Sequence, residues 1–109
     1  MRKFAAVLIA VSAIAAAFAT FPKEHVIGTW LLNGTDVNTK WVFYKDQKFL
    51  FKGTMSTSRG TWSTDGNKIS LTWTEIDGKP VKANTVKGSY PLLEDGSWQV
   101  DQYNYKKKK

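Results

Sequence analysis

From residue 25 onward, apolar and polar residues alternate in short runs that are broken by glycine, aspartate and asparagine. No stretch keeps a 3.6-residue period over the dozen positions that a helix needs, whereas a two-residue period is typical of strands with one buried face. The pattern therefore predicts an all-β domain. Seven or eight strands at this spacing favour a small antiparallel up-and-down (meander) barrel, with a two-sheet sandwich as the alternative.

The clearest hairpin spans residues 59–74 around Asp65-Gly66. Asp-Gly is a strong signal for a two-residue turn between strands. A turn centred on these two residues would place Trp62 opposite Ile69 and divide the hairpin into one apolar and one polar face. The predicted inward face carries Trp62, Ile69, Leu71 and Trp73.

A second hairpin, residues 40–53, is rich in aromatic residues. A two-residue loop would pair Tyr44 with Phe49 and split the rings between two faces, whereas a three-residue loop at 45–47 would turn four rings to one side. We prefer the three-residue loop because it buries more apolar area. The expected pairs are Phe43 with Phe49 and Trp41 with Phe51.

Glycine followed by threonine or serine and then an aromatic residue occurs at Gly28, Gly60, Gly88 and Gly96. Glycine allows a strand to bend or to approach its neighbour closely, which a strongly curled sheet requires. The intervals between these positions are too irregular for a repeat protein. We expect further strands at 25–33, 82–90 and 97–105, and turns at 33–34, 77–80 and 94–96.

The first nineteen residues have the pattern of a secretory signal peptide. A short basic start precedes an apolar run from Phe4 to Phe18, and Ala17-Phe18-Ala19 fits the small-x-small site that signal peptidase cleaves. An uncleaved anchor helix is the alternative, but the apolar run falls short of the roughly 20 residues that span a bilayer. We expect a signal helix over residues 1–19, cleavage after Ala19, and a periplasmic or secreted product.

The chain of 109 residues has no cysteine, so the exported domain is neither cross-linked by disulfides nor lipidated. Five tryptophans, six phenylalanines and four tyrosines supply the apolar area for its core. Much of the net charge of +7 comes from Arg2, Lys3 and the run 106–109, which leaves the domain nearly neutral. We expect one domain over residues 20–105 and a disordered basic tail over 106–109.

Several of these segments together resemble a bacterial lipocalin-like domain, over about residues 26–75. The resemblance implies a small calycin-type antiparallel barrel, whose first-strand Trp30 seals one end, and a role in holding a small apolar ligand. It also leads one to look for a late arginine that stacks on Trp30, but Arg59 is the one arginine after the leader. The segments are Gly28-Thr29-Trp30, Trp41 to Phe49, Gly60-Thr61-Trp62, Asp65-Gly66-Asn67 and Leu71-Thr72-Trp73.

The inward side chains can either line a cavity or fill the core, since both outcomes occur in small barrels. Our first hypothesis is an exported, non-enzymatic, lipocalin-like protein that binds a small apolar ligand in or at the mouth of the barrel. The alternative is an envelope or secreted inhibitor or adaptor, with a filled core, that binds a protein partner through loops such as 33–39 and 54–58. The candidate ligand-binding set is Trp30, Trp41, Phe43, Phe49, Phe51, Trp62, Leu71 and Trp73.

The sequence offers little for catalysis. With His25 as the one histidine and no cysteine, neither a Cys/His pair nor a multi-histidine metal site can form, and Glu75 and Asp77 look like solvated turn residues. We therefore expect no catalytic residues, metal or cofactor. Most lysines fall on the opposite face from the aromatic rings, which argues against nucleic-acid binding. Membrane contact is expected only through an uncleaved leader or weak electrostatics of the tail.

Overall fold

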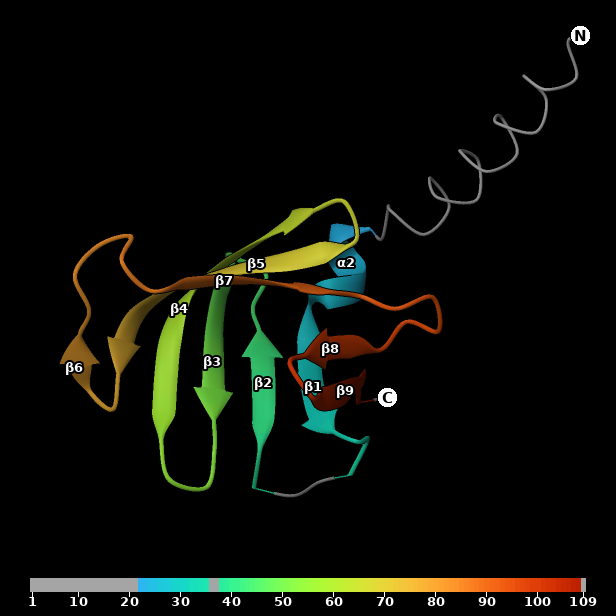
Figure 1. Ribbon diagram of the computed structural model, residues 1–109, viewed down its shortest axis with the longest axis horizontal. Helices are drawn as coiled ribbons and strands as arrows, with labels where there is room; N and C mark the ends of the chain where they lie inside the picture. The colour runs from blue at the N-terminus through green and yellow to red at the C-terminus, as the bar shows by residue number, and fades with distance from the viewer. Residues whose placement is uncertain (1–21, 36–37, 109) are drawn as a thin grey trace, which may run out of the picture.

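The computed structural model describes residues 22–35 and 38–108, and within them one short helix and nine strands (Figure 1). The predicted leader, with its cleavage after Ala19, lies outside the described residues. Within the described part of the chain, no helix is long and apolar enough to cross a membrane. The elements are α2 (Lys23–Val26), β1 (Gly28–Leu32), β2 (Lys40–Phe43), β3 (Lys48–Lys52), β4 (Thr57–Asp65), β5 (Lys68–Ile76), β6 (Lys79–Pro80), β7 (Lys87–Pro91), β8 (Trp98–Val100) and β9 (Tyr103–Lys107).

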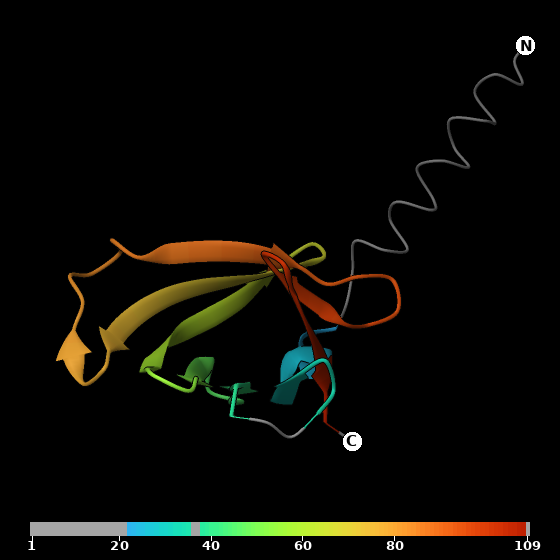
Figure 2. The same ribbon diagram turned by 60° about the horizontal axis from the view of Figure 1, so that its bottom comes forward.

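The strands form a single antiparallel sheet in the order β6-β5-β4-β3-β2-β1-β9-β8, with β7 also paired to β5. The sheet is curled through 199° into an open half-barrel, as Figure 2 shows. The prediction of an all-β, antiparallel, up-and-down fold is confirmed. The sheet is curled rather than closed, because β7 and β8 approach each other through one isolated bridge, between Leu92 and Trp98.

The hairpin of β2 and β3 has the predicted register. Phe43 lies opposite Phe49 and Trp41 opposite Phe51, so all four rings face the concave side. The three-residue loop ends at Gln47, whose φ of 67° is the left-handed conformation that commonly completes such loops. Burial of the aromatic rings therefore selects the register here.

The hairpin of β4 and β5 differs from its prediction in register. Trp62 lies opposite Leu71 instead of Ile69, and the turn is centred one residue later, on Gly66-Asn67. Gly66 has a φ of 63°, which glycine adopts without strain at the first central position of a two-residue turn. The shift amounts to two positions on the partner strand, so every side chain keeps its predicted face.

A β-bulge interrupts this hairpin next to Gly60. Gly60 pairs with Trp73 and the preceding Arg59 pairs with Glu75, so Thr74 has no partner on β4. An extra residue in one strand reverses the inside–outside alternation beyond it. Glu75 therefore lies on the convex side, with its carboxylate 3.7 Å from Arg59 Nε, and Ile76 turns toward the concave side.

The C-terminal third departs most from the prediction. The expected strand over 82–90 begins at Lys87, and the expected strand over 97–105 is two strands joined by a turn at Asp101, whose φ is 55°. The disordered basic tail expected from residue 106 is wrong at its start, because Lys106 and Lys107 belong to β9 and pair with β1. Backbone pairing with β1 holds these two lysines in the sheet.

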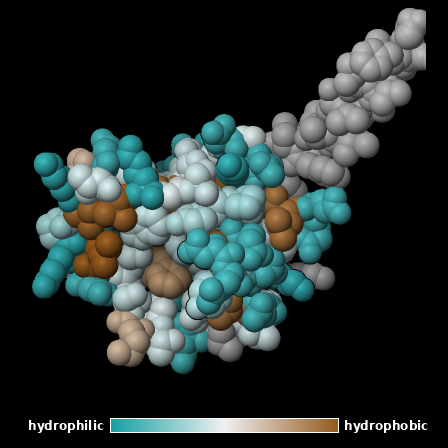
Figure 3. All heavy atoms as spheres, viewed as in Figure 1, coloured by the Kyte–Doolittle hydropathy of each residue, from teal (hydrophilic) through white to brown (hydrophobic). Residues whose placement is uncertain are grey.

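Helix α2 covers one end of the half-barrel, which we call the closed end. Val26 is fully buried there, and the indole N–H of Trp30 donates to its carbonyl at 2.9 Å. Lys107 crosses beside Gly28 and donates to the His25 carbonyl at 3.1 Å. The face of the molecule seen in Figure 3 is mainly hydrophilic, with apolar residues in several separate patches.

Replacing Gly60 with alanine tests the close approach at the bulge. The added Cβ would overlap the Thr72 carbonyl oxygen and lie 2.6 Å from the Phe49 ring. We expect Gly60→Ala to lower the free energy of unfolding by at least about 2 kcal/mol in urea denaturation, because neither neighbour can move freely. Ser63→Ala, at an exposed position of the same strand, should change it by no more than about 0.5 kcal/mol. Equal effects of the two substitutions would contradict this account of the bulge.

Candidate functional site

Most of the candidate aromatic set fills the closed end. Five of its eight members are at most 2% exposed, and they pack against one another and against Trp98. The ring centroids of Phe43 and Trp98 are 5.4 Å apart, and those of Phe43 and Trp62 are 5.8 Å apart, both edge to face. This half of the interior is a packed core. Its members from the candidate set are Trp30, Phe43, Phe49, Trp62 and Leu71.

Trp98 is the central ring that the candidate set lacks. It is fully buried, its ring centroid lies 4.9 Å from that of Trp41, and its indole N–H donates to the Tyr90 carbonyl at 3.1 Å. The signal was present in the sequence, since Gly96-Ser97-Trp98 repeats the pattern that precedes Trp30 and Trp62. Trp98 lies later in the chain than the two hairpins from which most of the candidates were taken, so it was not included with them.

The other three candidates, Trp41, Phe51 and Trp73, meet at the opposite end of the half-barrel. They line a depression of about 330 Å³ on the concave side, together with residues from β4, β5, β7 and β8. A second depression of about 400 Å³ adjoins it and shares Phe51 and Ser56. We call the two depressions together the mouth. Its residues are Leu32, Thr39, Trp41, Phe51, Gly53, Thr54, Ser56, Ser58, Trp73, Ile76, Tyr90, Val100, Asp101, Tyr103 and Tyr105.

Hydrogen bonds hold part of the mouth in place. The indole N–H of Trp73 donates to the buried Ser58 hydroxyl at 3.0 Å, which sets the orientation of the ring. Trp41 is packed between rings on both sides, with centroids 4.5 Å from Phe51 and 6.3 Å from Trp73. The concave surface of the mouth is thus made of rings that their neighbours orient.

Three phenols and one carboxylate line the mouth, and the pKa of two of the phenols, Tyr105 and Tyr90, is shifted. Burial raises the pKa of Tyr105 above its usual value, and the nearby Trp41 indole partly offsets this. Burial also raises the pKa of Tyr90, and the negative charge of Asp101 adds to the rise. Both phenols therefore stay protonated at neutral pH and can donate hydrogen bonds.

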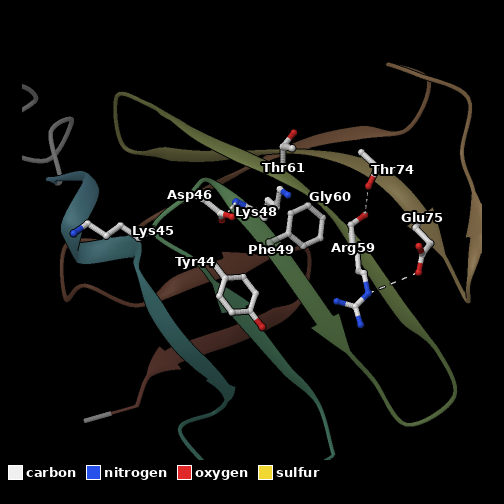
Figure 4. Close-up of a pocket in the computed structure, with 10 residues that line it drawn as sticks. All are labelled: Tyr44, Lys45, Asp46, Lys48, Phe49, Arg59, Gly60, Thr61, Thr74 and Glu75. Carbon is white, nitrogen blue, oxygen red and sulfur yellow. Dashed lines mark hydrogen bonds and ion pairs between the residues drawn. The ribbon is translucent and has the colours of Figure 1, made fainter.

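The convex side has a separate hollow of about 770 Å³ next to the bulge, which we call the outer hollow. Tyr44 and Arg59 lie on opposite sides of it in Figure 4, and the Thr74 hydroxyl is directed to the Arg59 carbonyl at 3.4 Å. Its surface mixes cationic, anionic, hydroxyl and aromatic groups. The residues are Tyr44, Lys45, Asp46, Lys48, Phe49, Arg59, Gly60, Thr61, Thr74 and Glu75.

Comparisons with known proteins find no match. No family model, curated protein or solved structure is significantly similar to the chain. Among the described residues there is also no group of three or more histidine and acidic side chains that could hold a metal ion.

Removing single tryptophans should separate the packed core from the mouth. We expect Trp98→Ala to cost about 3–5 kcal/mol in the free energy of unfolding, because it leaves a cavity among fully buried rings. Trp73→Ala should cost clearly less, because the Trp73 ring is only partly buried and water can fill its place. Urea denaturation followed by circular dichroism measures both. Similar losses for the two variants would mean that the mouth is as tightly packed as the core.

Proposed function

We propose that the protein is an exported, non-enzymatic binding protein of the lipocalin-like, calycin-type class, which holds a small apolar ligand at its mouth. One observation carries the proposal: Trp41, Phe51 and Trp73 come together from three strands at the end of the half-barrel that the core leaves open. Export to the periplasm or the medium rests on the leader, residues 1–19.

The dimensions of the mouth limit the ligand. Its depressions, of about 330 and 400 Å³, lie near the lower end of the range for small-molecule sites, roughly 300–1,000 Å³. Aromatic walls favour apolar ligands, because contact removes apolar area of both partners from water. A ligand with one or two rings or a short alkyl chain therefore fits better than a long lipid.

Binding of an apolar fluorescent probe tests this proposal. N-Phenyl-1-naphthylamine should bind saturably, with increased probe fluorescence, and Ile76→Glu should weaken its binding at least tenfold, because a carboxylate at the rim resists dehydration. Leu93→Glu is the matched control: both side chains are 37% exposed, but Leu93 lies outside the mouth. Absence of saturable binding, or equal weakening by both variants, would remove the support for a ligand at the mouth.

A second candidate function is that of an inhibitor or adaptor for another protein. The observation that favours it is the outer hollow, where Tyr44 is 44% exposed and three cations, Lys45, Lys48 and Arg59, outnumber the two carboxylates, Asp46 and Glu75. A partner segment with an acidic side chain and an apolar neighbour fits this combination, since the cation attracts the carboxylate and the ring packs against the apolar group. In this case the filled core supports the surface and the mouth has no ligand.

Photo-crosslinking from the two surfaces distinguishes this second function. With p-benzoylphenylalanine in place of Tyr44, a partner at the outer hollow should give a specific adduct in the cells that make the protein. Arg59→Glu should abolish that adduct, while the same probe in place of Tyr103, at the mouth, should give none. Adducts from position 103 that Arg59→Glu leaves unchanged would count against the outer hollow.

A further inference from the structure

Four of the five tryptophans satisfy their indole N–H groups within the protein, and Trp41 is the exception. Its ring is 4% exposed, and its Nε1 is the one buried side-chain nitrogen or oxygen without a hydrogen-bond partner in the described part of the chain. The four paired donors are Trp30 to Val26 O at 2.9 Å, Trp62 to Tyr44 O at 3.1 Å, Trp73 to Ser58 Oγ at 3.0 Å and Trp98 to Tyr90 O at 3.1 Å.

A buried donor without an acceptor destabilises a folded protein, because its hydrogen bond to water is lost on folding and no hydrogen bond within the protein replaces it. Such groups are rare in native structures, and each calls for a physical explanation such as a bound ligand or an ordered water. The position of this donor makes a bound ligand one of the explanations to test, because Trp41 lines the mouth rather than the packed end. The orphaned N–H is therefore next to the proposed ligand site.

Tyr105 is a neighbour of Trp41 at the mouth. Their ring centroids are 6.2 Å apart, edge to face, so the indole N–H and the phenol belong to adjacent side chains. They are not aligned as a hydrogen bond, since Nε1 has no partner of acceptable geometry. Tyr105 lines the second depression and Trp41 the first, so a group bound between them would meet two donors.

The charged residues at the mouth indicate which kind of hydrogen-bond acceptor a ligand can bring there. Among the described residues that line the mouth, Asp101 is the one ionisable acid and there is no lysine or arginine. A bound carboxylate would be desolvated without a cation to pair with and would be repelled by Asp101. A neutral carbonyl oxygen, with two lone pairs, accepts hydrogen bonds without this penalty.

We propose that the mouth takes a neutral apolar ligand with a carbonyl oxygen, such as an aryl ketone, ester or amide, and that Trp41 Nε1 is the donor that orients it. This rests on the proposed function and adds to it the polar end of the ligand. The apolar body would lie against Phe51 and Trp73. Tyr105 supplies a second donor on the far side of the carbonyl.

Three probes of nearly equal size test the proposal: 2-acetylnaphthalene with a ketone, 2-ethylnaphthalene with none, and 2-naphthoate with a carboxylate. In titration calorimetry of the full domain, the affinity for the ketone should exceed that for the carboxylate at least tenfold, because no cation at the mouth pairs with a carboxylate. In ¹H–¹⁵N spectra, the Trp41 indole N–H proton should move downfield with the ketone and not with the hydrocarbon. The indole signals of Trp30 and Trp62, which lie in the packed end and line neither depression, serve as internal references.

Matched variants assign the effect to one atom. Trp41→Phe keeps an aromatic ring but removes the N–H, and should reduce the preference for ketone over hydrocarbon by roughly fivefold to tenfold. Trp73→Phe makes the same change at an indole that already donates to Ser58. It should weaken the binding of the ketone and of the hydrocarbon by similar factors. If Trp41→Phe fails to fold, the indole shift in the wild-type protein still decides the matter.

The outcomes separate this inference from the proposed function. If none of the three probes binds, the ligand site at the mouth itself is wrong. If the probes bind but the ketone has no advantage that depends on Trp41, or if the Trp41 N–H signal does not move, a water satisfies the donor and the inference is overturned. Tight binding of 2-naphthoate would overturn the requirement for a neutral ligand.

Discussion

The contact between Trp41 and Trp98, edge to face with centroids 4.9 Å apart, connects the two halves of the curled sheet. Trp41 belongs to β2 in the middle of the sheet, and Trp98 belongs to β8 at the end of the strand order. Their packing therefore holds the β8 edge of the sheet over its central strands. No cysteine is available to cross-link these segments. Because buried rings remove large apolar areas from water, interlocked aromatics do here what disulfides do in many small exported domains.

The interior changes along its axis from a packed end to an open one. Helix α2 and the fully buried Val26 and Trp30 occupy one end, where little room remains. At the other end Phe51 and Trp73 are only partly buried, because no helix covers them among the described residues. The same aromatic pattern therefore serves two purposes, and the position of a ring along the axis decides which one.

The sequence predicted what local burial determines and failed where distant segments meet. The β2–β3 register was predictable because only one loop length turns all four rings inward. A two-residue period does not distinguish registers that differ by an even number, so Trp62 was on the right face but opposite the wrong partner. The pairing of Lys106 and Lys107 depends on β1 and on a turn at Asp101, for which the pattern gave no clear sign. Whether the sheet closes depends on how far β7 pairs with β8, which the alternation of apolar and polar residues does not indicate.

The bulge opposite Gly60 connects the two candidate surfaces. Because Thr74 is the extra residue, Glu75 emerges at the outer hollow beside Arg59, and Ile76 turns into the mouth. Without the bulge, strict alternation would exchange the faces of these last two residues and would put a carboxylate among the rings. The backbone irregularity thus keeps the mouth apolar on this strand while it supplies a charge to the convex side. It follows that the two surfaces can be tested independently only by side-chain substitutions that leave Gly60 and Thr74 in place.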